Sequence, residues 1–390
     1  MTEAPPPPLP LPRGFSCHVS NVGIKDATDD FVVVAADDPC AAAGLFTTSS
    51  FAGPSVVVSR ANIADQTAQA VVVISKNANV ATGAGGLADT EEVVAAVAGR
   101  LGFRPSDVLI ASTGVIGRRY PMDRLRAGIA ALPAALTDFD ATDVARGIMT
   151  TDTVMKTAAA QLGAARIVGV AKGVGMIEPN MATLITLFFT DAAVDADKLD
   201  RVFRRVIGRT FNCVSIDTDT STSDTAIIMA SGAAGRVDGH RFEQALHEVA
   251  LSLTKQVARD GEGAETLIEV LVDGAGSPQQ ARTVAKAIVN SPLVKTAVHG
   301  ADPNWGRVAM AIGKCTTAAE IDQSAVVIRF GEQEVYPAAV GDAGLAALTE
   351  YMGGDEVRIH VSLGAGQADA TVWGCDLTDG YVRINADYTT

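Results

Sequence analysis

The sequence predicts a mixed α/β fold built from at least two packed units. The chain has 390 residues, which is too long for one ordinary domain and long enough for two or three domains with cores of their own. β-branched runs that end at turn residues alternate with amphipathic segments, so strands and helices are mixed throughout. The sequence contains no internal repeat and no long linker, so we expect the units to pack tightly.

Short β-branched runs predict the strands of the first unit. Each run is rich in Val, Ile or Ala and is ended by residues that favour turns. The predicted strands are residues 31–36, 55–59, 70–75, 107–113 and 167–171.

Amphipathic segments predict helices that cover these strands. Residues 89–101 open with Asp-Thr-Glu-Glu, which suits the positive end of a helix, and continue with valines at helical spacing. Residues 197–209 carry one apolar stripe opposite a face of arginines, which we interpret as solvated. Residues 241–259 predict a third long helix.

The C-terminal part predicts a smaller α+β unit. A strand at 266–272 and a helix at 281–289 precede a loop-rich stretch at 290–307, and further strands follow at 326–330, 357–361 and 370–373. We therefore divide the chain into a tail (1–12), a catalytic core (13–280) and a C-terminal domain (281–390).

Composition and the N-terminal sequence indicate the cellular compartment of the protein. Hydrophobic residues make up 48% of the chain, but no run approaches the roughly 18 to 20 apolar residues that a membrane span needs. Met1 to Pro12 form a proline-rich stretch without a basic flank, which predicts a disordered tail rather than a secretion signal. The five scattered cysteines lack the spacing of a zinc site or a disulfide framework, so we expect buried thiols. These features predict a cytoplasmic enzyme.

Charge indicates the kind of ligand. The net charge of −14 argues against a nucleic-acid partner, because such proteins concentrate Lys and Arg. We therefore expect small-molecule substrates. The few histidines offer little for catalysis, and His240 and His247 fit surface or capping positions of the predicted helix at 241–259.

The most unusual segment runs from Lys172 to Thr183 and reads Lys-Gly-Val-Gly-Met-Ile-Glu-Pro-Asn-Met-Ala-Thr. A turn-rich approach leads directly into the apolar residues 184–189. If the bond after Ala182 is cut, Thr183 carries both a hydroxyl nucleophile and an α-amine with a pKa near 8 that can accept its proton. The alternative is an ordinary core strand entered through a Gly/Pro loop.

This segment resembles the processing site of the ornithine acetyltransferase family, also called glutamate N-acetyltransferases or ArgJ proteins. In that family a Lys-Gly-x-Gly-Met-Ile approach leads to Pro-Asn-Met-Ala-Thr, and the chain cuts itself before the threonine. The resemblance implies cleavage between Ala182 and Thr183, into an α chain (1–182) and a β chain (183–390). It extends from Gly14 to Thr390 and includes several distant motifs. They are residues 112–117, 149–153, 260–264, 290–297, 302–307 and 381–390.

The resemblance also implies roles for individual residues. Thr113 and Gly114 match the family's oxyanion hole, where one hydrogen-bond donor can contribute about 3 kcal/mol to the transition state. Without the family match, Ser-Thr-Gly is a common turn. The family's substrate-binding positions fall on Thr150, Lys172, Thr183, Glu262, Asn385 and Thr390. A lysine can pair with a carboxylate and a glutamate with an ammonium, as an acetylated amino acid requires.

One stretch departs from the family pattern. Where the family usually has Gly and Asn, this chain has Thr218 and Ser223 within residues 215–224. In this respect it is most similar to the ornithine acetyltransferases of clavulanic acid gene clusters, which leaves a primary and a specialised pathway both open. The acidic residues Asp217, Asp219 and Asp224 lack the glycine and glutamate of a calcium loop, so we favour a hydrogen-bonded turn over a metal site.

The resemblance implies transfer of an acetyl group from N2-acetyl-L-ornithine to L-glutamate through an acetyl-Thr183 intermediate, without a cofactor. It implies a layered α-β-β-α sandwich of the N-terminal-nucleophile type with a smaller C-terminal α+β domain, assembled as an α2β2 heterotetramer. Alternatives are a bifunctional form that also uses acetyl-CoA, a self-processing aminopeptidase or amidase, and a binding protein that never cleaves.

Overall fold

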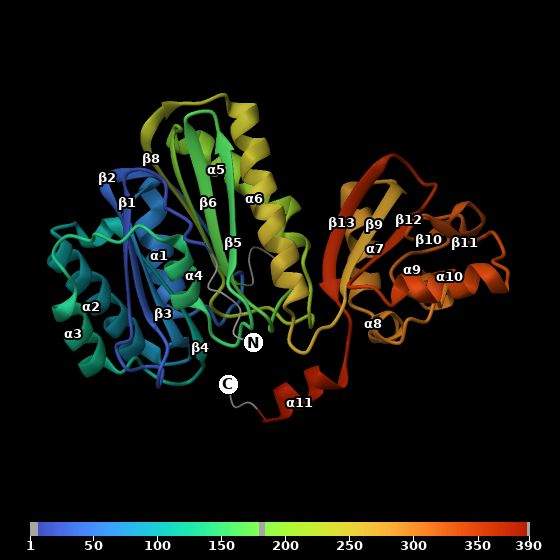
Figure 1. The fold of residues 1–390 in the computed structure, drawn as a ribbon, viewed down its shortest axis with the longest axis horizontal. Helices are drawn as coiled ribbons and strands as arrows, with labels where there is room; N and C mark the ends of the chain where they lie inside the picture. The colour runs from blue at the N-terminus through green and yellow to red at the C-terminus, as the bar shows by residue number, and fades with distance from the viewer. Residues whose placement is uncertain (1–6, 179–183, 388–390) are drawn as a thin grey trace.

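The computed structural model describes residues 7–178 and 184–387, and two sheets organise this part of the chain (Figure 1). The first sheet has eight strands in the order β4-β3-β2-β8-β7-β6-β5, with β1 paired to β2. Its strands are β1 (Phe15–Ser20), β2 (Phe31–Phe46), β3 (Thr67–Asn77), β4 (Val108–Val115), β5 (Lys156–Leu162), β6 (Ala165–Lys172), β7 (Ile185–Ala193) and β8 (Thr225–Arg236).

Strand β2 divides this sheet into two halves. Its first residues pair with β1 and β3, whereas residues 41–46 pair with β8. The register with β3 shifts between Ala35 and Cys40, a stretch that contains Pro39, which cannot donate a ladder hydrogen bond. The half with β1, β3 and β4 therefore packs against the half with β5 to β8.

The two halves form a layered α-β-β-α sandwich, in agreement with the family resemblance. Along β2, Val32 and Val34 belong to the core between the halves, whereas Phe31 and Val33 face the opposite side, because successive side chains alternate. Helices α2 and α3 cover the outer face of the first half, and α5 and α6 cover that of the second. The helices of this unit are α1 (Pro54–Asn62), α2 (Gly83–Leu101), α3 (Met122–Ala131), α4 (Ala141–Ile148), α5 (Ala196–Arg209) and α6 (Gly239–Arg259).

One predicted strand of this unit is wrong. Residues 55–59 lie in α1, which begins at Pro54, a residue suited to the first position of a helix. The Ser59 hydroxyl donates to the Ile110 carbonyl at 2.6 Å and accepts from the Ile110 amide at 2.7 Å, which joins α1 to β4. Packing against β4 thus outweighs the β-propensity of the three valines.

The other elements of the first unit agree with the sequence prediction in type. Predicted strands 31–36, 70–75, 107–113 and 167–171 coincide with parts of β2, β3, β4 and β6, and the helix predicted at 197–209 is α5. Helix α2 begins at Gly83 rather than at Asp89. Asp89 lies inside the helix, where its carboxylate forms an ion pair with Arg119. The predicted site residues Thr113 and Gly114 lie at the end of β4.

The second sheet forms the smaller unit. Its order is β11-β10-β12-β9-β13, with β9 and β12 parallel and the other pairs antiparallel. Its strands are β9 (Leu267–Ala275), β10 (Val327–Phe330), β11 (Gln333–Tyr336), β12 (Glu356–Ser362) and β13 (Ala368–Cys375). Its helices are α7 (Pro278–Val289), α8 (Pro292–His299), α9 (Trp305–Gly313), α10 (Asp342–Met352) and α11 (Asp379–Asp387).

Three features of the domain division differ from the sequence prediction. The second sheet includes β9, so it begins before residue 281, where the sequence placed the boundary. The stretch 290–307 is not mainly loop, because α8 begins after a cap from Ser291 and α9 begins at Trp305. Within the predicted tail, Leu11 is buried and its amide donates to the Phe139 carbonyl. Residues 1–6 of that tail lie outside the described residues.

The cysteines are free thiols, and all but Cys315 are buried, as the sequence predicts. Burial raises the pKa of Cys17 and of Cys40 to about 12, which keeps both thiols protonated. Across residues 7–178 and 184–387, no helix combines the length and the apolar character needed to cross a bilayer.

Candidate active site

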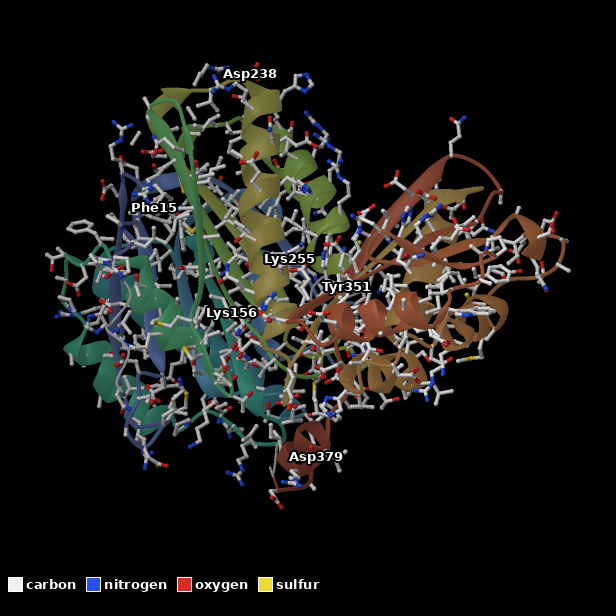
Figure 2. The ribbon with its side chains drawn as sticks, turned by 45° about the vertical axis from the view of Figure 1, so that its right-hand side comes forward. Phe15, Lys156, Asp238, Lys255, Tyr351 and Asp379 are labelled. Carbon is white, nitrogen blue, oxygen red and sulfur yellow. The ribbon has the colours of Figure 1, made fainter. Side chains whose placement is uncertain are left out.

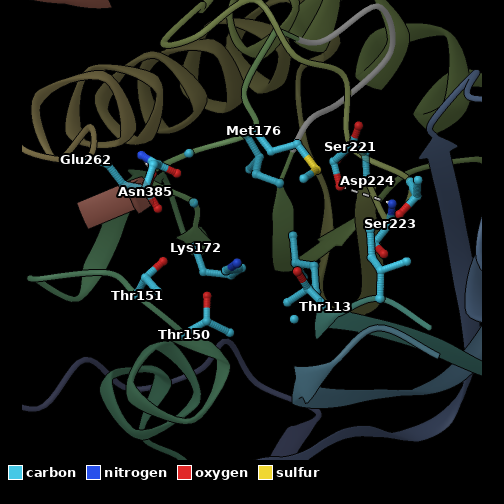
Figure 3. A pocket seen from close by; sticks show the side chains of 17 residues that line it. Thr113, Thr150, Thr151, Lys172, Met176, Ser221, Ser223, Asp224, Glu262 and Asn385 are labelled. Atoms are coloured by element: carbon cyan, nitrogen blue, oxygen red, sulfur yellow. Dashed lines mark hydrogen bonds between the residues drawn. The ribbon is translucent and has the colours of Figure 1, made fainter. Parts of the chain in front are cut away.

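Six of the predicted site residues line one pocket (Figure 3). Thr113 and Gly114 come from the end of β4, and Lys172 comes from the end of β6. The others are Thr150, Glu262 and Asn385. The lining combines polar and charged groups with apolar side chains, as small-molecule sites do.

The proposed nucleophile and two further predicted residues, Ala182 and Thr390, cannot be placed in this pocket. They and Thr183 lie outside the described residues. Leu184, the residue that follows Thr183 in the chain, does line the pocket. The pocket is therefore adjacent in sequence to the predicted cleavage point.

Gly114 occupies a position that a side chain cannot fill. Its φ is +133°, a conformation that favours glycine, and a Cβ built there would lie 2.1 Å from the backbone carbonyl carbon of Lys76. The close approach follows from parallel pairing, because Lys76 on β3 is the partner of Gly114 in the sheet register. The backbone beside Thr113 is thus fixed by strand pairing.

Buried hydroxyl groups hold the strand end behind Thr113. Ser112 donates to the Ser55 hydroxyl at 3.1 Å, and the Tyr120 hydroxyl donates to Ser112 at 2.7 Å. Burial raises the pKa of Tyr120 to about 12, so it remains a neutral donor. This network connects α1, β4 and the loop before α3 behind the pocket.

Lys172 is the buried cation of the pocket. Burial lowers the pKa of its ammonium, and the negative charge of Asp152 opposes this effect. Among the described carboxylates, none forms an ion pair within 4 Å of its Nζ atom. An incoming carboxylate would therefore supply the nearby negative charge that favours the protonated form of this buried amine.

Glu262 is the acidic counterpart of Lys172. It lies just after α6, its amide donates to the Val174 carbonyl at 2.8 Å, and its Oε2 accepts from Asn385 Nδ2 at 2.9 Å. Burial raises the pKa of this carboxyl group, and the hydrogen bond from Asn385 lowers it. A Cβ on Gly175 would lie 2.5 Å from the Glu262 carboxylate, so the glycine leaves room for it.

The turn at 215–224 anchors the chain just before the predicted cleavage point. The carboxylate of Asp217 accepts from the amides of Met176 at 2.6 Å and Ile177 at 2.8 Å. Glu178 is held by the Ser215 hydroxyl at 3.0 Å and by Asn290 at 2.5 Å. Asp217 thus uses its carboxylate to hold the backbone of the neighbouring segment at Met176 and Ile177.

Sequence reasoning missed other residues that line or support the pocket. Met176, Thr151 and Ser221 line it without having been predicted there, and Asp224 and Ser223 were considered only as metal or variant positions. Behind the pocket, buried Lys156 pairs with Asp152 and Asp260. The only signal for these two acids was their place inside the motifs at 149–153 and 260–264.

Comparison with known proteins gives a consistent result. The model of the ArgJ family matches residues 16–390. The chain is 58% identical to the arginine biosynthesis bifunctional protein ArgJ 2 of Nostoc sp., over 97% of this chain and 98% of the relative. It is 56% identical to the glutamate N-acetyltransferase Oat2 of Streptomyces clavuligerus, over 97% and 98% of the two chains. The crystal structure of the arginine biosynthesis bifunctional protein ArgJ from Bacillus halodurans aligns with this chain at 41% sequence identity and a TM-score of 0.48. The alignment covers 51% of this chain and 96% of the crystallised chain.

Proposed function

Because this chain belongs to the ArgJ family, we propose that it is a self-processing enzyme that moves an acetyl group from N2-acetyl-L-ornithine to L-glutamate. At the coarser level it is an acyltransferase. One observation carries the proposal. Residues from four separate segments, Thr113 with Gly114, Lys172, Glu262 and Asn385, line one pocket that Leu184 also lines.

Processing would begin with the Thr183 hydroxyl attacking the carbonyl carbon of Ala182. The peptide bond breaks as its nitrogen takes up a proton, and an ester joins the two parts. Water then hydrolyses this ester, which leaves a carboxylate on Ala182 and a free amine on Thr183. The hydrogen bonds that the amides of Met176 and Ile177 donate to Asp217 support this step, because they hold the chain a few residues before the predicted cut.

Transfer would use the same hydroxyl. The α-amine of Thr183 takes its proton while the oxygen attacks the acetyl carbonyl carbon, and Thr113 and Gly114 stabilise the negative oxygen. Ornithine leaves with that proton, and the acetyl group remains as an ester on Thr183. The amine of glutamate then attacks the ester by the reverse steps, so each proton and electron pair is returned without a cofactor.

Charge complementarity supports this substrate class. The ammonium of Lys172 fits the substrate carboxylate, and the carboxylate of Glu262 fits the side-chain ammonium of acetylornithine. Thr150 offers a hydroxyl in the same pocket, and Thr390 completes the proposed set from outside the described residues. We also propose an α2β2 heterotetramer in the cytoplasm, serving arginine biosynthesis or a specialised pathway.

The proposal is tested by intact-mass spectrometry and by product analysis. We expect two fragments that meet at Ala182 and Thr183, and a mass gain of one acetyl group on the second fragment when acetylornithine is given without glutamate. Transfer of the acetyl group from acetyl-CoA to glutamate would support the bifunctional alternative. Peptide cleavage or free acetate as the main product would support an aminopeptidase or amidase instead. An intact, active chain would refute processing.

Acetylornithine binding is expected to weaken as the pH falls. Glu262 must be ionised to hold the substrate ammonium, and its pKa is raised above the ordinary 4.5 by burial. The KM for acetylornithine should therefore rise as the pH falls through a value above 4.5. Steady-state kinetics on the acid side, with circular dichroism to verify folding, measure this midpoint.

Two variants identify the titrating group. Asn385→Ala removes a hydrogen bond that lowers the pKa of Glu262, so the midpoint should move to higher pH. Glu262→Gln should give a high KM that no longer changes over this range. An unchanged acid midpoint in Glu262→Gln would assign the titration to another group.

A further inference from the structure

Lys156 is a fully buried lysine that lies behind the pocket, at the start of β5 (Figure 2). Its ammonium lies 2.8 Å from Asp152 Oδ1 and 2.5 Å from Asp260 Oδ2. Both carboxylates are buried, at 0% and 5% exposure of the side chain. Burying three charges is costly, and such a group persists only with close pairing and further hydrogen bonds.

Asp152 connects the lysine to two walls of the pocket. Its Oδ2 accepts from the amide of Thr150 at 3.0 Å, and its Oδ1 accepts from the amide of Gly173 at 2.7 Å. Thr150 itself lines the pocket, and Gly173 follows Lys172 directly. One carboxylate therefore sets the distance between the turn at Thr150 and the strand end that carries Lys172.

Asp260 connects the same lysine to the third wall. Its carboxylate accepts from both the amide and the hydroxyl of Thr153, at 3.1 Å from the amide nitrogen. Asp260 ends α6, and Glu262 lies two residues later in the turn that bonds to Val174. The turn that contains Glu262 is thus hydrogen-bonded, through Asp260 and Thr153, to the segment that contains Thr150.

We propose that Lys156 is a positioning residue for substrate binding. It does not line the pocket, but through Asp152 and Asp260 it holds Thr150, Lys172 and Glu262 at their mutual distances. This inference rests on the proposed acetyl transfer, because it concerns how the same pocket binds the acetylated amino acid. The oxyanion edge at Thr113 belongs to another strand and does not depend on this lysine.

The test compares Lys156→Met with a matched control in the self-cleaved enzyme. Lys255 on α6 also contacts two carboxylates, Glu269 at 2.8 Å and Glu356 at 3.3 Å, but its side chain is 35% exposed and it is not among the residues that line the pocket (Figure 2). We expect Lys156→Met to lower kcat/KM for acetylornithine about 100-fold, mainly through KM, because small misplacements of binding groups have effects of this size. Lys255→Met should keep the wild-type KM.

A second variant covers the case in which Lys156→Met does not fold. Asp260→Asn keeps the pair between Lys156 and Asp152 and loosens only the turn that carries Glu262, so it should raise KM with a smaller loss of thermal stability. A wild-type KM in every folded variant at Lys156 or Asp260 would overturn the inference and leave only a structural role. Absence of acetyl transfer in the wild-type enzyme would instead refute the proposed function, so the two failures are distinguishable.

Discussion

Replacing Thr183 with alanine is expected to leave the chain uncut and to reduce acetyl transfer by more than about 10⁴-fold, as loss of a nucleophile does in other covalent enzymes. The substitution removes the hydroxyl that would attack both the Ala182 carbonyl and the acetyl group. It also prevents formation of the α-amine that would act as base. Intact-mass spectrometry and a coupled assay of ornithine release measure the two effects on one preparation.

Thr183→Ser provides the matched control. Serine keeps the hydroxyl and, after cleavage, the α-amine, so the variant should still cut itself and transfer acetyl at a reduced rate. Full activity in Thr183→Ala would refute the proposed nucleophile. Full-length Thr183→Ser without activity would show that the methyl group of threonine is needed to orient the hydroxyl.

Replacing Gly114 with alanine is expected to lower kcat about 10²- to 10³-fold, equivalent to roughly 3 to 4 kcal/mol of transition-state stabilisation. The new Cβ would lie 2.1 Å from the backbone of Lys76, and φ at +133° is strained for any residue with a side chain. The backbone amide in the proposed oxyanion hole must therefore move. Single-turnover acetylation of Thr183 measures the effect on the chemical step.

Gly102 gives the control for strain alone. It caps α2 with φ at +76°, and a Cβ there meets no atom within 4 Å. Gly102→Ala should cost about 1 kcal/mol of stability without a change in kcat. Equal losses of kcat in Gly102→Ala and Gly114→Ala would mean that the activity responds to general destabilisation rather than to the proposed oxyanion hole.

The sequence predicted the elements whose periodicity reflects burial. Helix α5 was found because its apolar stripe packs on the sheet, and β3 because its valines are buried on both faces. Residues 55–59 were misassigned because the helix there depends on Ser59 bonding to a distant strand. The domain boundary was misplaced because strand pairing of β9 with β12 and β13 is not visible in local sequence.

The candidate site was predictable only through family motifs. Thr113, Lys172 and Glu262 are separated by long stretches of chain, and no local pattern indicates that they meet. Lys156 was missed because a single lysine at the start of a strand is usually exposed, and only the fold shows two buried carboxylates around it. Contacts between residues far apart in the sequence, such as these ion pairs, determine the parts of the site that the sequence did not predict.

Pairing across the predicted cut has a consequence for folding. β6 and β7 lie on opposite sides of residues 182 and 183, yet they form one antiparallel ladder, and β2 pairs with β8 across the same division. Once cut, the two fragments would still share a core and unfold together. Refolding would then require two molecules to meet, so its rate should depend on protein concentration, whereas the uncut chain refolds as a single molecule.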